Sequence, residues 1–278
     1  MEGNLDRRRL ATALKDLRIR SGLSGQALGR VLGWTQTRVS RTENDRRRIT
    51  AEEVTRWADA TGASADVRAE LAALAEGAAR EVRSWWDVHA GGMTRRQLEI
   101  ADLEAHAERI CNFQPVVPGL LQTADYARRV LALADVTGQG DIPAAVAARM
   151  HRQAVLYDTA KQFDYVLTEA ALRWQPADDP AVTRAQADRL LSVATLPNVS
   201  IAVLPSAAAM FVLPTSGFVI YEIPDEPLVL LETLTDELLF GGERELAAYR
   251  EAFARLREAS VTGDDAWALI SAAMSTSR

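Results

Sequence analysis

A cluster of amide, hydroxyl and guanidinium side chains follows the glycine at position 33, at spacings that suit one short helix. In the DNA major groove, an amide pairs with an adenine edge, a guanidinium with O6 and N7 of guanine, and a threonine methyl group with thymine. A helix that carries such groups near its N-terminus can therefore read base sequence. The expected base-reading residues are Thr35, Gln36, Thr37, Arg38 and Arg41.

Three consecutive arginines, Arg46, Arg47 and Arg48, come shortly after this stretch. A basic run just beyond a reading helix suits the phosphate backbone better than base edges, and phosphate contacts fix the position of the helix on the duplex. We expect these arginines, together with Arg30, to bind phosphates. The alternative is that the polar groups form only the solvated face of an ordinary helical bundle.

Local signals predict five helices over the first 78 residues, and these would hold the reading helix in place. The first, over residues 5–21, has leucines at helical spacing. The others begin after side chains that cap helices, and Thr50 with Glu53 three residues later forms a capping-box pattern. Gly33 permits the sharp turn between the second and third helices. The four expected capping residues are Ser24, Thr35, Thr50 and Ser64.

The charge of the chain is divided unevenly along its length. The 278 residues carry a net charge of −6, yet residues 1–62 hold 13 Lys and Arg against 8 Asp and Glu, a net of +5, which leaves −11 for the rest. Only the N-terminal part therefore suits a phosphate backbone. With one cysteine, no signal peptide and no long apolar run, we expect a cytoplasmic protein with no membrane segment.

The rest of the chain predicts a mainly α protein with a C-terminal α/β part. Residues 65–110 have mostly helical spacing, broken near Gly77 or at the glycines 91 and 92. We expect a five-helix helix-turn-helix head over residues 1–78, a helical linker and dimerisation region over 79–112, and an α/β regulatory domain over 113–278. In that domain a small sheet would be covered by helices, with a parallel pair of strands followed by a meander. The expected strands are 163–167, 200–204, 218–222 and 228–232, and the expected helices are 123–134, 143–158, 180–194 and 236–258.

Residues 23–48 resemble the repressor-type helix-turn-helix of Xre-family regulators, in the actinobacterial form in which LGW, a polar triplet, VSR and EN follow in order. The resemblance implies a recognition helix over residues 35–41 and places Asn44 beside a phosphate. The family usually has Gln directly after the Ser that opens the second helix; here Gly25 stands there and Gln26, our further phosphate candidate, follows it. The family also prefers an apolar residue at Thr42 and a glycine at Asp45.

The C-terminal part resembles the large domain of unknown function that is fused to Xre-type heads in actinobacterial regulators. The similar strings are FQPVVPGLLQTADYARRVL at 113–131, RQAVLYD at 152–158, TEAALR at 168–173 and PNVSIAVLP at 197–205. Thr168 replaces the usual Asp before Glu169, and the loop 205–215 lacks the glycines expected there. Such proteins are similar to antitoxins and are commonly paired with a small neighbouring protein. The resemblance thus implies a small protein partner encoded nearby.

The residues give little support for catalysis. The three histidines are dispersed, Cys111 has no neighbouring histidine, and no phosphate-binding glycine motif occurs. Glu169 and Arg173 are spaced as an ordinary i,i+4 helix pair. We therefore expect no enzyme, with no catalytic residue, metal or cofactor.

A binding role remains for the C-terminal part. The loop 205–215 carries a run of apolar residues in an irregular setting, as expected for a surface that contacts a protein partner; the run is Met210, Phe211, Val212 and Leu213. The alternative is a one-component regulator whose C-terminal domain senses a small-molecule ligand. Because one helix-turn-helix reads only a few base pairs of double-stranded DNA, we also expect a homodimer, with its interface in the helical stretch 65–110.

Overall fold

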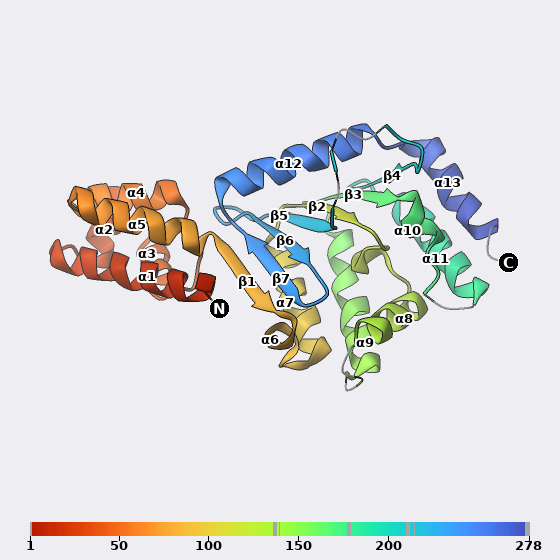
Figure 1. Cartoon of the computed structure of the whole chain (residues 1–278), viewed down its shortest axis with the longest axis horizontal. Coiled ribbons are helices and arrows are strands. Elements are labelled where there is room, and N and C mark those ends of the chain that lie inside the picture. Colours follow the sequence, from red (N-terminus) through yellow and green to blue (C-terminus); the bar gives the residue numbers. More distant parts are fainter. Residues whose placement is uncertain are drawn as a thin grey trace.

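The structure, a computed structural model, has a small helical head at one end and a larger body built on a sheet (Figure 1). It describes residues 2–135, 138, 140–176, 179–209, 212–213 and 215–275, the side chains of residues 2–5, 274 and 275 excepted. Two of the expected partner-contacting residues, Met210 and Phe211, lie outside the described residues. The expected fold class, mainly α with a C-terminal α/β part, is confirmed.

The head contains five helices that pack on a common core. They are α1 (Glu2–Arg20), α2 (Gly25–Leu32), α3 (Gln36–Glu43), α4 (Ala51–Ala60) and α5 (Ala65–Ala78). The four capping residues predicted from the sequence are confirmed, and each accepts a hydrogen bond from a main-chain N–H in the first turn of its helix. Trp57 is fully buried at the centre, and its indole N–H donates to the carbonyl of Leu14 at 3.0 Å.

The body is a seven-stranded mixed sheet with the strand order β1-β7-β6-β5-β2-β3-β4. Strands β2, β3 and β4 are parallel to one another, whereas β5 and β6 form the expected meander, which β7 extends, and β1 pairs antiparallel with β7. The strands are β1 (Arg80–Ser84), β2 (Arg109–Gln114), β3 (Gln162–Thr168), β4 (Val199–Leu204), β5 (Phe218–Glu222), β6 (Leu228–Glu232) and β7 (Asp236–Phe240).

Helices cover both faces of the sheet, because successive side chains of each strand point to opposite faces. In Figure 1, α12 (Glu243–Glu258) lies above the sheet, and α7 (Gly92–His106), α8 (Ala124–Ala134) and α9 (Ile142–Arg152) lie below it. On β3, Tyr165 and Leu167 enter the larger core, which the lower helices share, whereas Val166 between them enters the core beneath α12. The other elements are α6 (Trp85–His89), α10 (Glu169–Arg173), α11 (Pro180–Val193), α13 (Gly263–Ser275) and two short 3-10 helices, η1 (Gly119–Leu121) and η2 (Gln153–Tyr157).

The helical linker expected over residues 79–112 is wrong at both of its ends. Strand β1 follows α5 after one residue, and β2 takes residues that were expected to continue a helix, so α6 and α7 are flanked by strands of the sheet. The long helical stretch proposed as a dimer interface over 65–110 is therefore interrupted by β1. Residues 236–240 were also expected to be helical and instead form β7, with the helix beginning at Glu243.

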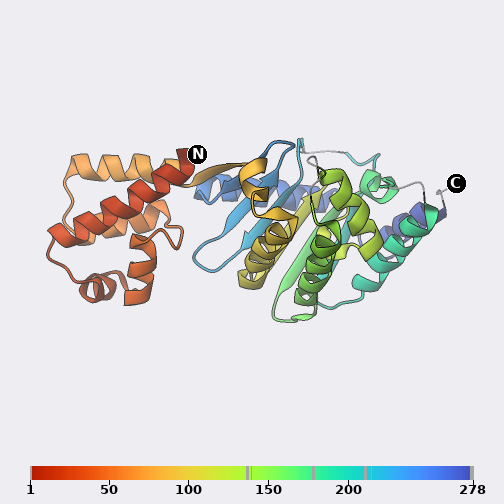
Figure 2. The same cartoon turned by 90° about the horizontal axis from the view of Figure 1, so that it is seen from below.

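Strand β1 joins the head to the sheet without an intervening loop. Figure 2 shows it leaving the head as a ribbon that enters the edge of the sheet. All five of its residues are paired with β7, from Arg80 opposite Phe240 to Ser84 opposite Asp236. At the head end, the N–H of Gly241 donates to the carbonyl of Ala79 at 2.8 Å. The head is thus held by main-chain hydrogen bonds.

Candidate nucleic-acid interface

Helices α2 and α3 meet at a tight turn that fixes the angle of the second helix. Gly33 ends α2 with φ of 72°, in the left-handed region that favours glycine. Gly29 is required for another reason, because a Cβ on it would lie 2.7 Å from the carbonyl oxygen of Trp34. Val39 is 1% exposed and packs in the core of the head, so the side of α3 that carries it is the inner one. The outer face of α3 is left polar.

Most of the residues expected to contact DNA lie on the surface of the head. The structure leaves the side chains of eight of them exposed; they are Gln26, Arg30, Thr35, Gln36, Thr37, Arg41, Asn44 and Arg46. Asn44 also donates from its side-chain amide to the carbonyl of Ser40 at 2.7 Å, which orients it at the end of α3. The structure contains no nucleic acid, so the contacts of these side chains with bases and phosphates stay predictions.

Arg38 is only partly exposed, because acidic side chains hold it from two sides. Its guanidinium donates to Glu53 at 2.6 Å and to Asp225 at 3.0 Å. The guanidinium carbon also lies 4.5 Å from the ring centroid of Trp34, which is a cation–π contact. Glu53 belongs to the head, whereas Asp225 lies in the turn between β5 and β6 of the body. One of the five expected base-reading residues therefore faces a carboxylate of the body.

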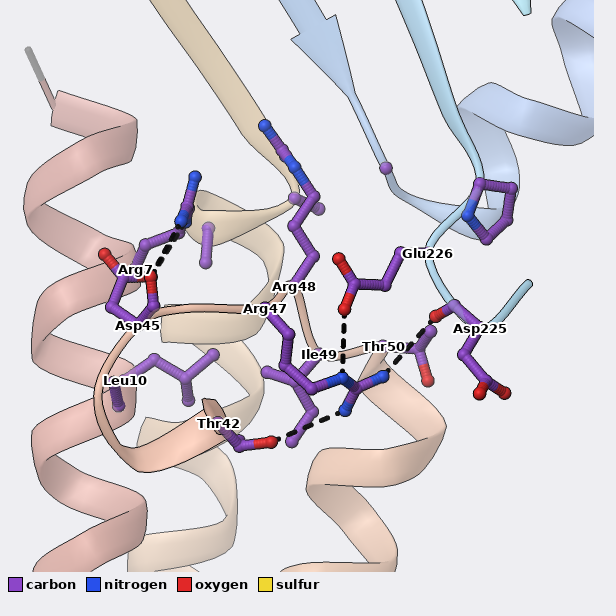
Figure 3. A pocket seen from close by; sticks show the side chains of 15 residues that line it. Arg7, Leu10, Thr42, Asp45, Arg47, Arg48, Ile49, Thr50, Asp225 and Glu226 are labelled. Carbon is purple, nitrogen blue, oxygen red and sulfur yellow. Dashed lines mark hydrogen bonds and ion pairs between the residues drawn. The ribbon is translucent and has the colours of Figure 1, made fainter. Parts of the chain in front are cut away.

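Arg47 is buried between the head and the body, and only 4% of its side chain is exposed. Its guanidinium donates to both carboxylate oxygens of Glu53, at 3.0 and 3.1 Å. It also donates to the carboxylate of Glu226 at 3.2 Å and to the carbonyl of Asp225 at 3.4 Å (Figure 3). The expectation that Arg47 binds phosphates is wrong for this structure, because a guanidinium with these partners has no face left for DNA.

Arg48 is held in the same way by the linking strand. It donates to Glu81 of β1 at 2.7 Å, and Arg7 of α1 binds the same carboxylate at 3.0 Å. Burial, followed by the positive charge of Arg7, lowers the pKa of the Arg48 guanidinium. Arg7 also contacts the carboxylate of Asp45 at 2.9 Å (Figure 3). Arg48, with 15% of its side chain exposed, is thus turned toward Glu81 in this structure, and its contact with a phosphate stays a prediction.

The arginines thus divide into an exposed group and a group clamped by the body. We call the second group, Arg38, Arg47 and Arg48 with Glu53, Glu81, Asp225 and Glu226, the arginine clamp. Its acidic members were not anticipated from the sequence, because the two in the β5–β6 turn are about 180 positions away from their arginines. Asp225 has φ of 64°, a left-handed conformation that Asp adopts more readily than most residues.

Two departures from the Xre pattern find a place in this geometry. Thr42 is buried, and its hydroxyl donates to the carbonyl of Arg38 at 3.0 Å and lies 3.5 Å from Arg47, where an apolar residue would leave no hydrogen-bonding group. Asp45 has φ of 52°, which is the left-handed conformation that a glycine would adopt without strain. Its side chain instead binds Arg7.

The apolar loop of the body is described only in part. Leu213 is 83% exposed, whereas Val212 is half-buried against the core beneath α12. The string VPGLLQT lies in the interior, since Val117, Leu120 and Leu121 all belong to the larger core.

Among the described residues, no cluster of His, Cys, Asp and Glu has the arrangement needed to hold a metal ion. Within the same residues, no helix is both long and apolar enough to span a bilayer.

Comparison with known sequences identifies both parts of the chain. Residues 9–71 match the family described as a helix-turn-helix domain, which covers α2 and α3. Residues 97–272, more than half of the chain, match the family described as a domain of unknown function, DUF5753. The chain belongs to the DUF5753 family. A DUF5753 domain that follows a helix-turn-helix head is the arrangement expected of a DNA-binding regulator.

Other comparisons add little to this assignment. No curated protein matches the chain. One solved structure, described as that of TrmBL2, an archaeal chromatin protein with a novel mode of DNA binding, is 15% identical in sequence. The matched region covers 81% of this DUF5753 chain and 69% of the TrmBL2 chain. Its TM-score is 0.33. A likeness this weak carries no functional argument.

Proposed function

We propose that the chain is a sequence-specific DNA-binding transcriptional regulator of the Xre type, working in the cytoplasm, whose reading unit is residues 1–78. The observation that carries the proposal is the division of α3 into two faces. Val39 is buried in the head, Thr37 and Arg41 lie exposed on the opposite side, and Gln36, nearly one turn before Val39, is exposed at the start of the helix. A helix held by its apolar face, with amide and guanidinium groups free on the other, has the form that the major groove accepts.

The experiment is to sequence the DNA fragments that the purified chain retains from a random pool. Gln36→Ala should change the preferred bases at one or two positions, because an amide that reads adenine is lost. Arg46→Ala should weaken binding to all sequences alike, because phosphate contacts carry no sequence information. Arg173→Ala, an exposed arginine of α10 paired with Glu169, is the matched control and should change neither. If Gln36→Ala weakens all sequences equally, α3 is not the reading helix.

We propose that two copies bind one operator, since a single head reads too few base pairs for genomic selectivity. Light scattering of the chain alone and on its selected DNA tests this proposal. A 1:1 complex with full affinity would contradict it.

We propose further that the body binds a small protein encoded nearby, as in the antitoxin-like pairing that the resemblance implies, and that the partner changes DNA occupancy. The exposed Leu213 supports an interaction surface on the loop before β5. The test mixes the purified chain with the product of the neighbouring gene and measures the mass of the complex. Leu213→Ser should weaken the complex, whereas Leu133→Ser, equally apolar and 63% exposed on α8, should not. No complex with the unchanged chain would refute the pairing.

A small-molecule effector is the second candidate for the role of the body. Two adjoining cavities of about 160 and 230 Å³ beside α7 and α9 favour it. A bound water needs only roughly 10–15 Å³ on the same measure, so each cavity is large enough for more than isolated waters.

A further inference from the structure

The smaller cavity lies between helices α7 and α9 and the lower face of the sheet. Its walls include three arginines, and we call it the arginine cavity; the polar lining residues used below are Arg96, Glu104, Asn112, Arg149 and Arg152. The larger cavity is bounded by Trp85, His89 and Met93, and we call it the tryptophan cavity. The two share Arg96 and Arg149 in their walls, so they lie side by side.

The three arginines in the wall of the arginine cavity face two carboxylates, Glu104 and Glu232, and Glu232 lies 3.6 Å from Arg96. Among the residues that the structure describes, no carboxylate forms an ion pair with Arg149. Its guanidinium donates only to neutral amide oxygens, to Gln97 at 3.1 Å and to Gln122 at 2.7 Å. Burial, followed by the charge of Arg152, lowers the pKa of Arg149 to about 9. A guanidinium in these surroundings favours an anion as its missing partner.

Arg152 is poorly compensated as well. Its side chain is 8% exposed, and the nearest oxygen of Glu104 lies 3.6 Å from it, which is beyond good hydrogen-bonding distance. Burial raises the pKa of the Glu104 carboxyl to about 7, so this carboxylate is only partly ionised at neutral pH. Arg96, by contrast, is paired with the buried Glu237.

Within the part of the chain that the structure describes, several buried polar atoms of the residues that line the arginine cavity have no hydrogen-bonding partner. They are Nε and Nη1 of Arg152, Nε of Arg96, Oε2 of Glu104 and Oδ1 of Asn112. The residues Arg96 and Glu104 are each 4% exposed. Buried polar groups are almost always paired, and one left unpaired costs stability. Both arginines line the cavity, so a ligand with acceptor oxygens there would provide partners of the kind that these donors lack.

We propose that the body binds a small anionic metabolite, whose carboxylate or phosphate group is held by Arg149 and Arg152 and whose apolar part lies in the tryptophan cavity. Guanidinium groups bind both kinds of oxyanion through paired N–H donors. The indole of Trp85, stacked on the His89 ring with centroids 4.1 Å apart, forms a flat wall suited to a ring or an apolar chain.

The position of this site gives it a route to the head. Trp85 comes directly after β1, and its main-chain N–H donates to the main-chain carbonyl of Thr235 at 2.6 Å. Four residues earlier on the same strand, Glu81 holds Arg7 and Arg48 of the head. An effect on DNA rests on the proposed regulatory function, whereas binding of the anion does not, so binding is measured on the full chain without DNA.

The test uses benzoate and phenyl phosphate as anionic probes and benzamide as the neutral match for benzoate. Calorimetry should show one site for at least one of the anions and at least tenfold weaker binding of benzamide. Arg149→Gln should weaken the anion by about tenfold or more, while Arg128→Gln, an exposed arginine of α8 paired with Asp125, should leave it unchanged. Circular dichroism checks that each variant is folded.

A second measurement is independent of whether Arg149→Gln folds. In the unchanged chain, the indole N–H signal of Trp85, assigned with Trp85→Phe, should shift as the anion is titrated. The proposal is overturned if neither anion binds more tightly than about 10 mM, if benzamide binds as tightly as the anion that binds best, or if the Trp85 signal does not move. It is also overturned if Arg149→Gln is folded and binds normally, or if Arg41→Ala abolishes binding, since that would place the anion on the head.

Discussion

Replacing Arg47 by alanine separates a structural arginine from a DNA-binding one. The substitution leaves Glu53, 10% exposed at its side chain, with Arg38 as its remaining ion-pair partner, and it leaves Glu226 without the bond that joins it to the head. Removing one member of a buried ion pair costs about 3–5 kcal/mol. Because Arg38 still neutralises part of the charge and Glu226 is one-third exposed, we expect a loss near the lower end, about 3 kcal/mol, which is more than a hundredfold in the unfolding equilibrium.

The assay is urea unfolding, followed by tryptophan fluorescence, since Trp34 lies against the Arg47 guanidinium, 5.3 Å from ring centroid to guanidinium carbon. Arg47→Ala should lower the midpoint of the transition that reports the head. Arg46→Ala is the matched control, because Arg46 is exposed and exposed substitutions change stability by less than about 0.5 kcal/mol. In DNA binding, Arg46→Ala should have the larger effect of the two variants. It should weaken binding to all sequences and reduce the slope of log affinity against log salt by about 1.

One result would refute this reasoning directly. If Arg47→Ala unfolds at the same urea concentration as the unchanged chain and loses DNA affinity as Arg46→Ala does, Arg47 is a phosphate contact and the clamp is not formed in solution. The unfolding midpoint of Arg47→Lys should lie between those of the unchanged chain and Arg47→Ala, since an ammonium keeps the charge but cannot form the paired hydrogen bonds of a guanidinium.

Three further outcomes follow from the structure. Asp225→Asn, which preserves the left-handed backbone, should raise DNA affinity up to about fivefold in a binding titration, because it removes a 60%-exposed partner of Arg38 worth at most about 1 kcal/mol; unchanged affinity would mean that Arg38 is not withdrawn from DNA. The buried Glu104 carboxyl has a folded-state pKa of about 7, above its unfolded value, so the native state binds the extra proton and stability should fall by about 3 kcal/mol between pH 5 and 8. Glu104→Gln should remove that fall in urea titrations across this range, and parallel curves for the two proteins would contradict the assignment. Asn198→Ala should cost about 2 kcal/mol, because the buried amide nitrogen donates to three main-chain carbonyls, whereas Asn44→Ala on the surface should cost less than about 0.5 kcal/mol.

The head could be predicted almost residue by residue because its signals are local. Each of the helices α2 to α5 begins after a capping side chain, and the capping box of Thr50 and Glu53 has both of its hydrogen bonds. Caps and turn glycines act over three or four residues, so a reader of the sequence has all the partners in view.

The strands that were missed have partners far away in the chain. Arg80–Ser84 is short and charged, and it becomes a strand because β7, more than 150 positions later, offers its edge. Residues 236–240 read as the start of the following helix for the same reason. By contrast, 218–222 is dense in β-branched and aromatic residues and 228–232 is a short apolar run, and both were predicted with the bounds that the structure has.

The arginine clamp shows the same limit at the level of side chains. A run of three arginines beside a reading helix indicates phosphate binding wherever its neighbours are unknown. Only the fold brings Glu81 and Glu226 to Arg48 and Arg47, and it leaves Arg46 as the exposed member of the run.

The main-chain pairing of β1 has a consequence for how such a protein is dissected and how it evolves. A head tied to its body by a flexible tether can be exchanged for another by recombination within the tether. Here a cut after β1 would remove the outermost strand and leave the N–H and C=O groups of β7 unpaired along an open edge, which invites edge-to-edge aggregation. A new head must therefore be joined ahead of Arg80 and must also provide a basic partner for Glu81, whose side chain is 8% exposed. Exchange of the head alone thus meets a structural obstacle, even though the two halves match two separate sequence families.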